Sequence, residues 1–342
     1  MITNRPTRSI LLLLMLTILV FMVNVFFGSV NIPVKEVIMS LTGQEVEQES
    51  WNYIIQNYRL PKAVTAVLVG SGLGVSGLLM QTLFRNPLAG PFVLGISSGA
   101  SLGVATLVMG SALMGGVLGG LGDSKWGIII ASSLGSFLVL LAVLAVSIRV
   151  RDTMAILIIG LMFASLTSAI VGILSFFTSA EQLQQYIFWG FGSLGNLSWN
   201  EVFILGIVFF LGIAFSIFSL KALNSLLLGE HYAKSMGLNI NKSRILIILA
   251  TSLLAGGITA FAGPIAFIGL AIPHIARQIM NSGNHSTLMP AVIFIGAIVM
   301  LICDSIAQLP TTDYTLPINA VTAIFGAPVV IWLLVRKKNM IF

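Results

Sequence analysis

The sequence is poor in charge, with 17 Lys and Arg and 11 Asp and Glu among its 342 residues. These few charges gather in short islands between long apolar runs. A soluble domain carries about a quarter charged residues, so that class is excluded. About 20 consecutive apolar residues cover the hydrocarbon layer of a bilayer. The runs lack the two-residue alternation of membrane barrels, and the sequence therefore predicts an all-α polytopic membrane protein.

Other absences exclude further classes of site. Cys303 is the only cysteine, so an intrachain disulfide is impossible and a cysteine metal site has no basis. The three histidines lack metal-ligand spacing, and no G-x-x-x-x-G-K-[ST] motif is present to hold ATP. The basic residues stand singly at the ends of apolar runs, which is typical of charges that set membrane topology. We therefore expect no metal, no cofactor and no nucleic-acid partner for this chain.

The charged and Pro/Gly-rich islands divide one transmembrane domain, residues 1–342, into ten predicted spans. The predicted spans are 10–29, 60–83, 92–113, 126–148, 154–176, 199–221, 243–262, 265–280, 287–308 and 316–335. An even number of spans places both termini on one side. With that side cytoplasmic, thirteen basic residues lie inside and four lie outside, namely Lys35, Arg59, Lys62 and Lys125. This asymmetry agrees with the positive-inside rule.

Two Gly-Pro breaks indicate an internal repeat. The string AGPFVLG at 89–95 is echoed by AGP and FIG within 262–269, and each follows a Gly-rich span. The repeat units would be spans two to five and seven to ten, an offset that inverts the second copy, as in many transporters. Chance similarity of Gly/Pro breaks is the alternative.

A glycine motif at 72–77 matches the dinucleotide fingerprint G-x-G-x-x-G. That fingerprint needs a strand before it and a helix after it, whereas here it lies inside a predicted span. Small residues in a span let helix backbones approach closely, so we interpret the motif as a packing surface. No span carries a charge near its centre, and Asp304 lies toward the outer end of the ninth. An ion-coupled transporter usually has such a charge.

Three connecting segments carry candidate sites. Arg59 and Lys62 open the second span outside, where they either anchor the helix at the interface or dock an acidic partner. Residues 85–91 contain two prolines and a glycine and must break the helix, either as a tight turn or as backbone that lines a cavity. Residues 221–244 predict a short amphipathic helix pair, interrupted at Gly229 and ended by Gly237. It serves as a docking surface or lies on the membrane.

Together these strings resemble the permease subunits of type II ABC importers, which take up iron–siderophores, haem and vitamin B12. The resemblance is carried by RLPK at 59–62, SGLLMQTLFRNPLAGPFVLGISSGAS at 76–101, LGEHYAKSMGLN at 228–239, AGPIAFIGLAIPHIAR at 262–277 and INAVTAIFGAPVVIWLL at 318–334. It implies a transport subunit without catalytic residues. Its expected partners are a second permease copy or a sister permease, two ABC ATPases that bind ATP and Mg, and an extracytoplasmic binding protein.

The resemblance also implies roles for individual residues. The 223–238 loop would hold the coupling helices, with ATPase-coupling residues Leu228, Gly229, Glu230, Ala233 and Gly237. The cytoplasmic gate would include Asn86, Leu88 and Thr153. Arg59 and Lys62 would dock the binding protein. Three positions depart from the family pattern near the outer face, namely Gln308, Thr315 and Asn319.

The predicted function is therefore the permease of an ATP-driven importer in the bacterial inner membrane. Its cargo would be a metal chelate, and an iron–siderophore is the first choice. The alternatives are haem or cobalamin as cargo, and an ion-coupled secondary transporter.

Overall fold

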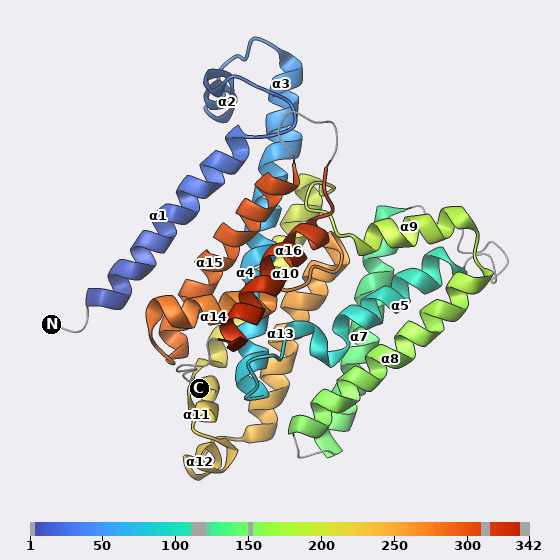
Figure 1. The fold of residues 1–342 in the computed structure, drawn as a ribbon, viewed down its shortest axis with the longest axis vertical. Coiled ribbons are helices and arrows are strands. Elements are labelled where there is room, and N and C mark those ends of the chain that lie inside the picture. The colour runs from blue at the N-terminus through green and yellow to red at the C-terminus, as the bar shows by residue number, and fades with distance from the viewer. Residues whose placement is uncertain (1–3, 111–121, 123, 150–152, 309–314, 336–342) are drawn as a thin grey trace.

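The structure is a computed structural model that describes residues 4–110, 122, 124–149, 153–308 and 315–335. Every regular element in these ranges is helical, as predicted (Figure 1). The α-helices are α1 (Asn4–Phe26), α2 (Val34–Leu41), α3 (Glu49–Ile54), α4 (Leu60–Leu83), α5 (Ile96–Val108), α7 (Lys125–Arg149), α8 (Thr153–Phe177), α9 (Ala180–Gly190), α10 (Trp199–Phe218), α11 (Leu220–Leu227), α12 (Glu230–Ser235), α13 (Ile240–Ala262), α14 (Ile268–Met280), α15 (His285–Ala307) and α16 (Ile318–Val335). A π-helical turn, η1 (Ile55–Arg59), joins α3 to α4, and a 3-10 turn, η2 (Pro91–Leu94), precedes α5.

Seven of the ten predicted spans are confirmed as helices long and apolar enough to cross a membrane. They are Pro6–Phe26, Glu49–Leu83, Lys125–Val146, Met154–Phe177, Trp199–Phe218, Ile240–Ala262 and His285–Ala307. The prediction of ten full spans is thus only partly confirmed. The segments predicted at 92–113, 265–280 and 316–335 contain the shorter helices α5, α14 and α16, and residues 111–113 lie outside the described part of the chain.

The Gly-Pro breaks explain why two of these helices are short. Gly95 at φ +74° and Phe267 at φ +67° stand immediately before α5 and α14, and the left-handed backbone there ends any continuous helix. Each helix has 13 residues and is about 20 Å long, less than the ~30 Å hydrocarbon layer. The two breaks meet around a cavity of about 160 Å³, lined by residues of both that include Pro91 and Phe267. The predicted break at 85–91 is therefore present and lines a cavity.

Helix α4 is the centre of the bundle and packs against α15, α13, α14 and α10. Its glycines allow this close packing. A methyl group on Gly70 would lie 2.1 Å from the carbonyl oxygen of Gly296, and one on Gly77 would lie 1.7 Å from that of Gly269. Both distances are far below van der Waals contact, so only glycine fits. The packing interpretation of the 72–77 motif is thus supported.

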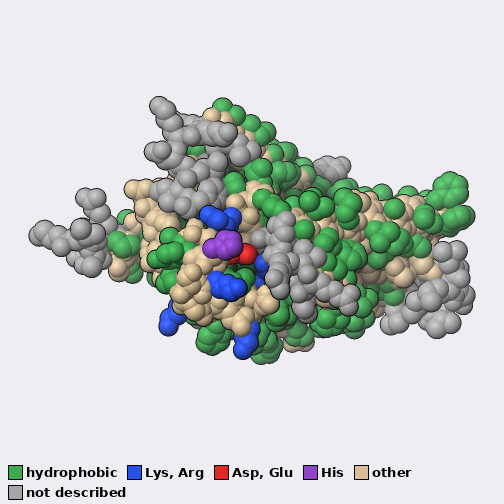
Figure 2. Space-filling model, turned by 90° about the horizontal axis from the view of Figure 1, so that it is seen from below, with side chains coloured by type: hydrophobic (Ala, Val, Ile, Leu, Met, Phe, Trp, Pro, Cys, Tyr) green, Lys and Arg blue, Asp and Glu red, His purple; other side chains and the backbone are tan. Residues whose placement is uncertain are grey.

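The two ends of the bundle differ in character. Helices α2 and α3 lie at the upper end in Figure 1, and α11 and α12 lie at the lower end. Lys and Arg side chains gather around a histidine and an acidic side chain on the lower face (Figure 2). Arg85, Lys221, Lys234 and Lys242 are all exposed.

Candidate functional site

The α11–α12 hairpin is the most prominent feature of the lower end. Leu223 and Leu226 are buried and hold α11 against the bundle. Gly229 at φ +104° separates the two helices, and Gly237 at φ +84° ends the second. Both values lie in the region that favours glycine, so these residues are needed for the turns. The predicted helix pair with its two glycine breaks is therefore present.

An exposed apolar stripe runs along the hairpin. Leu228, Tyr232 and Met236 stand four residues apart, and each is more than half exposed. Tyr232 and Met236 are about one helical turn apart, in α12 and at its end, and Leu228 stands exposed just before the Gly229 turn. We call these three exposed side chains the hairpin stripe. Of the three, only Leu228 was predicted from the sequence, because α12 is too short for its pattern to define a face.

The other predicted coupling residues lie behind the stripe or at its turns. Ala233 is fully buried, so its side chain faces the bundle. Glu230 forms an ion pair with the nearly buried Arg244 of α13 at 3.2 Å, which fixes the start of α12. Gly229 lies beside Arg85, whose guanidinium would be 3.5 Å from a methyl group at that position. The hairpin turn and the 85–91 loop are therefore neighbours.

The predicted gate residues lie in this neighbouring loop. The Asn86 side chain accepts a hydrogen bond from the Leu88 amide at 2.9 Å, and the Asn86 carbonyl accepts one from Ala89 at 3.1 Å. These bonds form a compact turn and leave Leu88 about half exposed. Thr153 begins α8, and its side chain lies outside the described part of the chain. The structure thus brings Asn86 and Leu88 together.

Arg59 is turned inward at the upper end of the bundle. It is 7% exposed and donates hydrogen bonds to the carbonyls of Val25 and Phe26 at 3.0 Å and to that of Val30. Those carbonyls follow or end α1, where a helix leaves acceptors unpaired. Arg59 therefore completes the end of the first helix.

Lys62 also faces the protein. Its ammonium lies 3.0 Å from the carboxylate of Asp304, which is 2% exposed. Asp304 further accepts hydrogen bonds from Asn24 at 3.0 Å and from Gln308 at 2.8 Å. Gln308, noted as a departure from the family pattern, is thus part of this buried cluster.

A hydroxyl-lined cavity of about 230 Å³ lies among α5, α8 and α9. Its lining residues are Ser97, Ser98, Ser101, Ala164, Thr167, Ser168, Val171, Tyr186 and Pro264. Ser101 and Tyr186 are hydrogen-bonded to each other across it. The lining contains no charged residue, so it offers many weak polar contacts and no strong ionic one. We call it the hydroxyl cavity.

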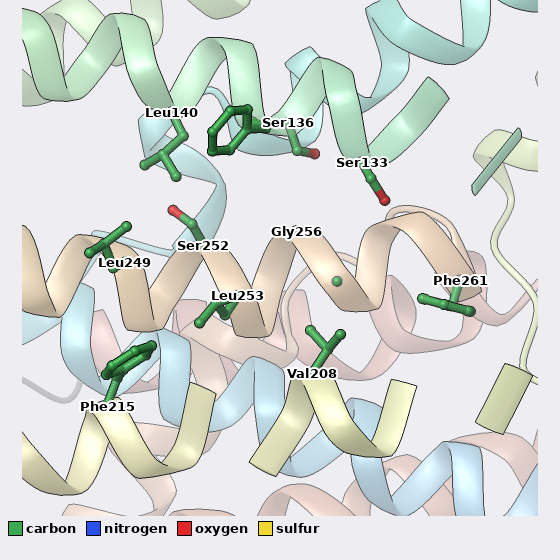
Figure 3. Close-up of a pocket in the computed structure, with 12 residues that line it drawn as sticks. Ser133, Ser136, Leu140, Val208, Phe215, Leu249, Ser252, Leu253, Gly256 and Phe261 are labelled. Atoms are coloured by element: carbon green, nitrogen blue, oxygen red, sulfur yellow. The ribbon is translucent and has the colours of Figure 1, made fainter. Parts of the chain in front are cut away.

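A second and more apolar cavity of about 310 Å³ lies between α7, α10 and α13. Ser136 of α7 and Ser252 of α13 point toward the space between these helices (Figure 3). Most of the remaining lining is aliphatic or aromatic, including Leu140, Val208 and Phe215. Its walls suit apolar contact, and it has fewer polar groups than the hydroxyl cavity.

Comparison with known proteins decides the family. Residues 15–336 match the family model described as the FecCD transport family. This chain belongs to that family. It is 35% identical to the vitamin B12 import system permease protein BtuC of Klebsiella pneumoniae, over 83% of each chain. It is 29% identical to the hemin transport system permease protein HmuU of Yersinia pestis, over 94% of this chain and 95% of the relative.

The fold agrees with this membership. A solved structure of a candidate metal-chelate type ABC transporter, in an inward-facing conformation, superposes with a TM-score of 0.84 at 27% identity. The match covers 96% of this chain and 99% of the other. This FecCD protein is therefore a multi-pass membrane permease of a type II ABC importer. It is a non-catalytic transport subunit, and its class implies ATPase and binding-protein partners.

Proposed function

We propose that this FecCD permease carries an iron–siderophore into the cytoplasm. In this proposal it works with a second permease copy or a sister permease, two ABC ATPases and an extracytoplasmic binding protein, in a bacterial inner membrane. Relatives named for vitamin B12 and for hemin have comparable identity, so identity alone does not choose the cargo. The observation that favours a siderophore is the hydroxyl cavity. Its uncharged donors and acceptors suit an oxygen-rich chelate better than an apolar porphyrin face, and an uptake assay is needed to separate the siderophore from cobalamin, whose amide groups suit the same lining.

Uptake into vesicles tests this proposal. The permease is reconstituted with its ATPase and binding-protein partners and offered a ferric hydroxamate, hemin or cyanocobalamin, with and without ATP. We expect ATP-dependent accumulation of the ferric hydroxamate. Accumulation of only hemin or only cyanocobalamin would reject a siderophore as the cargo but would still support an ATP-driven importer. Accumulation by the permease alone without ATP would instead support an ion-coupled transporter.

We further propose the ten-segment topology with both termini inside and an inverted repeat. Supporting contacts occur in parallel in the two halves. Helix α5 packs on α7 and α8, as α14 packs on α15 and α16, while α4 packs on α15 as α13 packs on α7. A single introduced cysteine in a Cys303→Ala background tests the topology. A cysteine at Ser235 should react with an impermeant thiol reagent only from inside and one at Glu47 only from outside, and the reverse pattern would invert the topology.

The hairpin stripe is our proposed contact with the ATPase. Apolar side chains on a turn beyond the membrane are costly to leave in water, and a partner groove would bury them. Met236→Asp should reduce co-purification of the ATPase at least tenfold, because it places a charge in that contact. Asn239→Asp is the matched control, since it adds the same carboxylate at a nearby exposed position while keeping an N-cap acceptor for Lys242. Equal co-purification of the two variants would remove the stripe from the interface.

The predicted coupling residues Gly229 and Ala233 give a second test of coupling at the same hairpin. A bulky residue at Gly229 is strained by its φ of +104°, and one at Ala233 meets the bundle. Both changes should therefore displace the hairpin and weaken ATPase association while membrane insertion continues. Unaltered association would count against the hairpin as the coupling element.

Docking of the binding protein at Arg59 and Lys62 is a separate proposal. Both side chains have internal partners here, so docking through them requires their release when the binding protein arrives. A charge swap, Lys62→Glu with Asp304→Lys, keeps an ion pair inside the fold. If Lys62 docks an acidic lobe, the swap still weakens binding-protein affinity, most visibly at low salt. Affinity equal to wild type in the swap would assign Lys62 to the fold alone.

A further inference from the structure

The last turn of α4 carries two buried polar side chains that hold different helices. Gln81 donates from Nε2 to the Leu270 carbonyl at 3.1 Å and accepts at Oε1 from Arg277 at 2.7 Å, both on α14. Its neighbour Thr82 lies 2.8 Å from Nε2 of His285, the first residue of α15. Gln81, Thr82 and His285 are buried. One turn of α4 therefore fixes the positions of both helices.

His285 continues the connection to the hairpin. The side-chain oxygen of Asn224 on α11 accepts from the His285 amide at 2.9 Å and lies 2.8 Å from Nδ1. The Asn224 amide nitrogen donates to Asn284 at 3.1 Å, which identifies the atom that faces His285 as the oxygen. Because that oxygen only accepts, Nδ1 carries a proton, while Nε2 is hydrogen-bonded to the Thr82 hydroxyl, which also donates to the Leu78 carbonyl at 2.9 Å. The histidine thus bridges α11 and α4.

The connection also reaches the gate loop. His274 of α14 places Nε2 2.9 Å from the carbonyl oxygen of Pro87, and since a carbonyl only accepts, the ring donates. His274 and Arg277 are three residues apart and therefore neighbours on one face of α14. The Gln81 carbonyl also accepts from the Asn86 amide at 3.1 Å. The loop that contains Leu88 is thus held both by α4 and by α14.

We propose that a series of buried hydrogen bonds transmits movement of the hairpin to the gate loop. The bonded groups are Asn224–His285–Thr82, Gln81–Arg277 and His274–Pro87. The inference rests on the proposed coupling role of the hairpin. The side chains named here are positioning residues, because they act through the loop and need not touch cargo. We call them the lower-end network.

The polar character of the network supports this role. Apolar packing would hold these helices together, but it tolerates sliding, whereas directional hydrogen bonds between buried groups fix one register. Leaving one such buried group unpaired is costly, so the hydrogen-bonded register is favoured. The hairpin, the end of α4 and the gate loop therefore move more readily as one body than separately. A rigid-body shift of packed elements is a common form of switching in proteins.

The test measures whether the distance between the two gate loops changes when nucleotide binds to the ATPases. A spin label at Leu88→Cys in a Cys303→Ala background reports the distance between the two gate loops in the permease–ATPase complex. The measurement is made without nucleotide and with ATP plus vanadate. The label pair in the otherwise unchanged protein should shift its distance distribution on nucleotide binding. Absence of any shift there, or of ATPase association, would reject the proposed coupling function itself.

Two variants then test the network. In Asn224→Leu we expect ATPase association and hydrolysis within twofold of the parent and a loss of most of the nucleotide-dependent shift. Ser225→Ala is the control, because that hydroxyl bonds only its own helix, at Lys221. His274→Leu, which removes the donor to Pro87 and changes no hairpin residue, should lose the shift as well. His274→Gln, which retains a donor for Pro87, should restore at least half of it.

Several outcomes would overturn the proposal. A full gate shift in Asn224→Leu or in His274→Leu would show that the hydrogen bonds are not needed. Equal behaviour of His274→Leu and His274→Gln would show that donation to Pro87 is not the link. If Asn224→Leu fails to bind the ATPase, the two His274 variants test the proposal instead. A monodisperse, ATPase-bound His274→Leu with an intact gate shift would also reject it.

Discussion

The Lys62–Asp304 pair offers a prediction that can be worked to a magnitude. The two charges are 3.0 Å apart, with the carboxylate 2% and the lysine side chain 21% exposed. At an effective dielectric constant of about 20, their attraction is about 5 kcal/mol. Desolvation offsets part of this gain, and the partly exposed ammonium is screened by solvent. We therefore expect a net coupling energy of about 2–3 kcal/mol.

The single changes should cost more than the double change. Lys62→Met leaves Asp304 buried with only neutral donors, Asn24 and Gln308, and we expect about 3 kcal/mol of destabilisation. Asp304→Asn keeps the shape of the side chain and leaves the ammonium near solvent, so its cost should be smaller. Lys62→Met with Asp304→Asn removes both charges and should recover at least half of the loss from Lys62→Met.

A double-mutant cycle in lipid micelles measures this coupling. Unfolding by SDS, followed by tryptophan fluorescence or helical circular dichroism, gives the free energy for each variant. Lys125→Met is a matched control, because that ammonium is bonded at the exposed surface to the Asn196 carbonyl and belongs to no ion pair in the described residues. A cost for Lys62→Met below about 0.5 kcal/mol, or equal to the control, would refute the reasoning.

Three further predictions follow from the packing and the caps. Gly77→Ala should prevent accumulation of folded protein, since its methyl group would lie 1.7 Å from the Gly269 carbonyl oxygen. A methyl group at Gly206 meets nothing within 4 Å, so Gly206→Ala should leave stability unchanged or raise it by about 1 kcal/mol. Expression and gel filtration compare the two variants, and equal yields would contradict the packing argument. Ser198→Ala removes the hydroxyl of the capping box that starts α10 and should lower the free energy of unfolding by about 1 kcal/mol in the same SDS titration. An unchanged free energy of unfolding would show that the cap does not stabilise the fold. Tyr186→Phe removes one hydroxyl from the hydroxyl cavity and should raise the apparent KM for uptake of a ferric hydroxamate several-fold with little change in stability. Unchanged uptake would show that the cargo does not contact this cavity.

Long apolar runs made the helical architecture predictable. The hydrocarbon thickness sets a minimum length, and charged islands mark where chains leave it, so seven predicted spans coincide with helices long and apolar enough to cross a membrane. The hairpin was also predictable, because Gly229 and Gly237 lie in a polar connecting segment, where glycine favours the end of a helix. The short length of α5 and α14 was harder to predict from the sequence. A Gly-Pro break indicates an interruption, but the sequence does not say how deep in the membrane the helix resumes.

The directions of side chains were harder to predict. Arg59 and Lys62 were expected to face a partner outside, and their internal acceptors lie on α1 and α15, segments that sequence position alone does not bring near them. Ala233 was expected at the ATPase contact, yet it is buried while Met236 is exposed. Helix α12 has only six residues, so its pattern is too short to define a face.

The Asn24–Asp304 contact joins residues 280 positions apart. During synthesis, the first helix therefore enters the bilayer long before its partner has been translated. Until α15 is inserted, Asn24 lacks its carboxylate acceptor and Lys62 lacks its counter-ion. Chains that stop short of Asp304 leave both groups without these partners at the upper end of the bundle. Biogenesis of this permease is thus completed late, because the contacts that hold Asn24 and Lys62 form only when the ninth predicted span arrives, whereas Arg59 can bond the end of α1 much earlier.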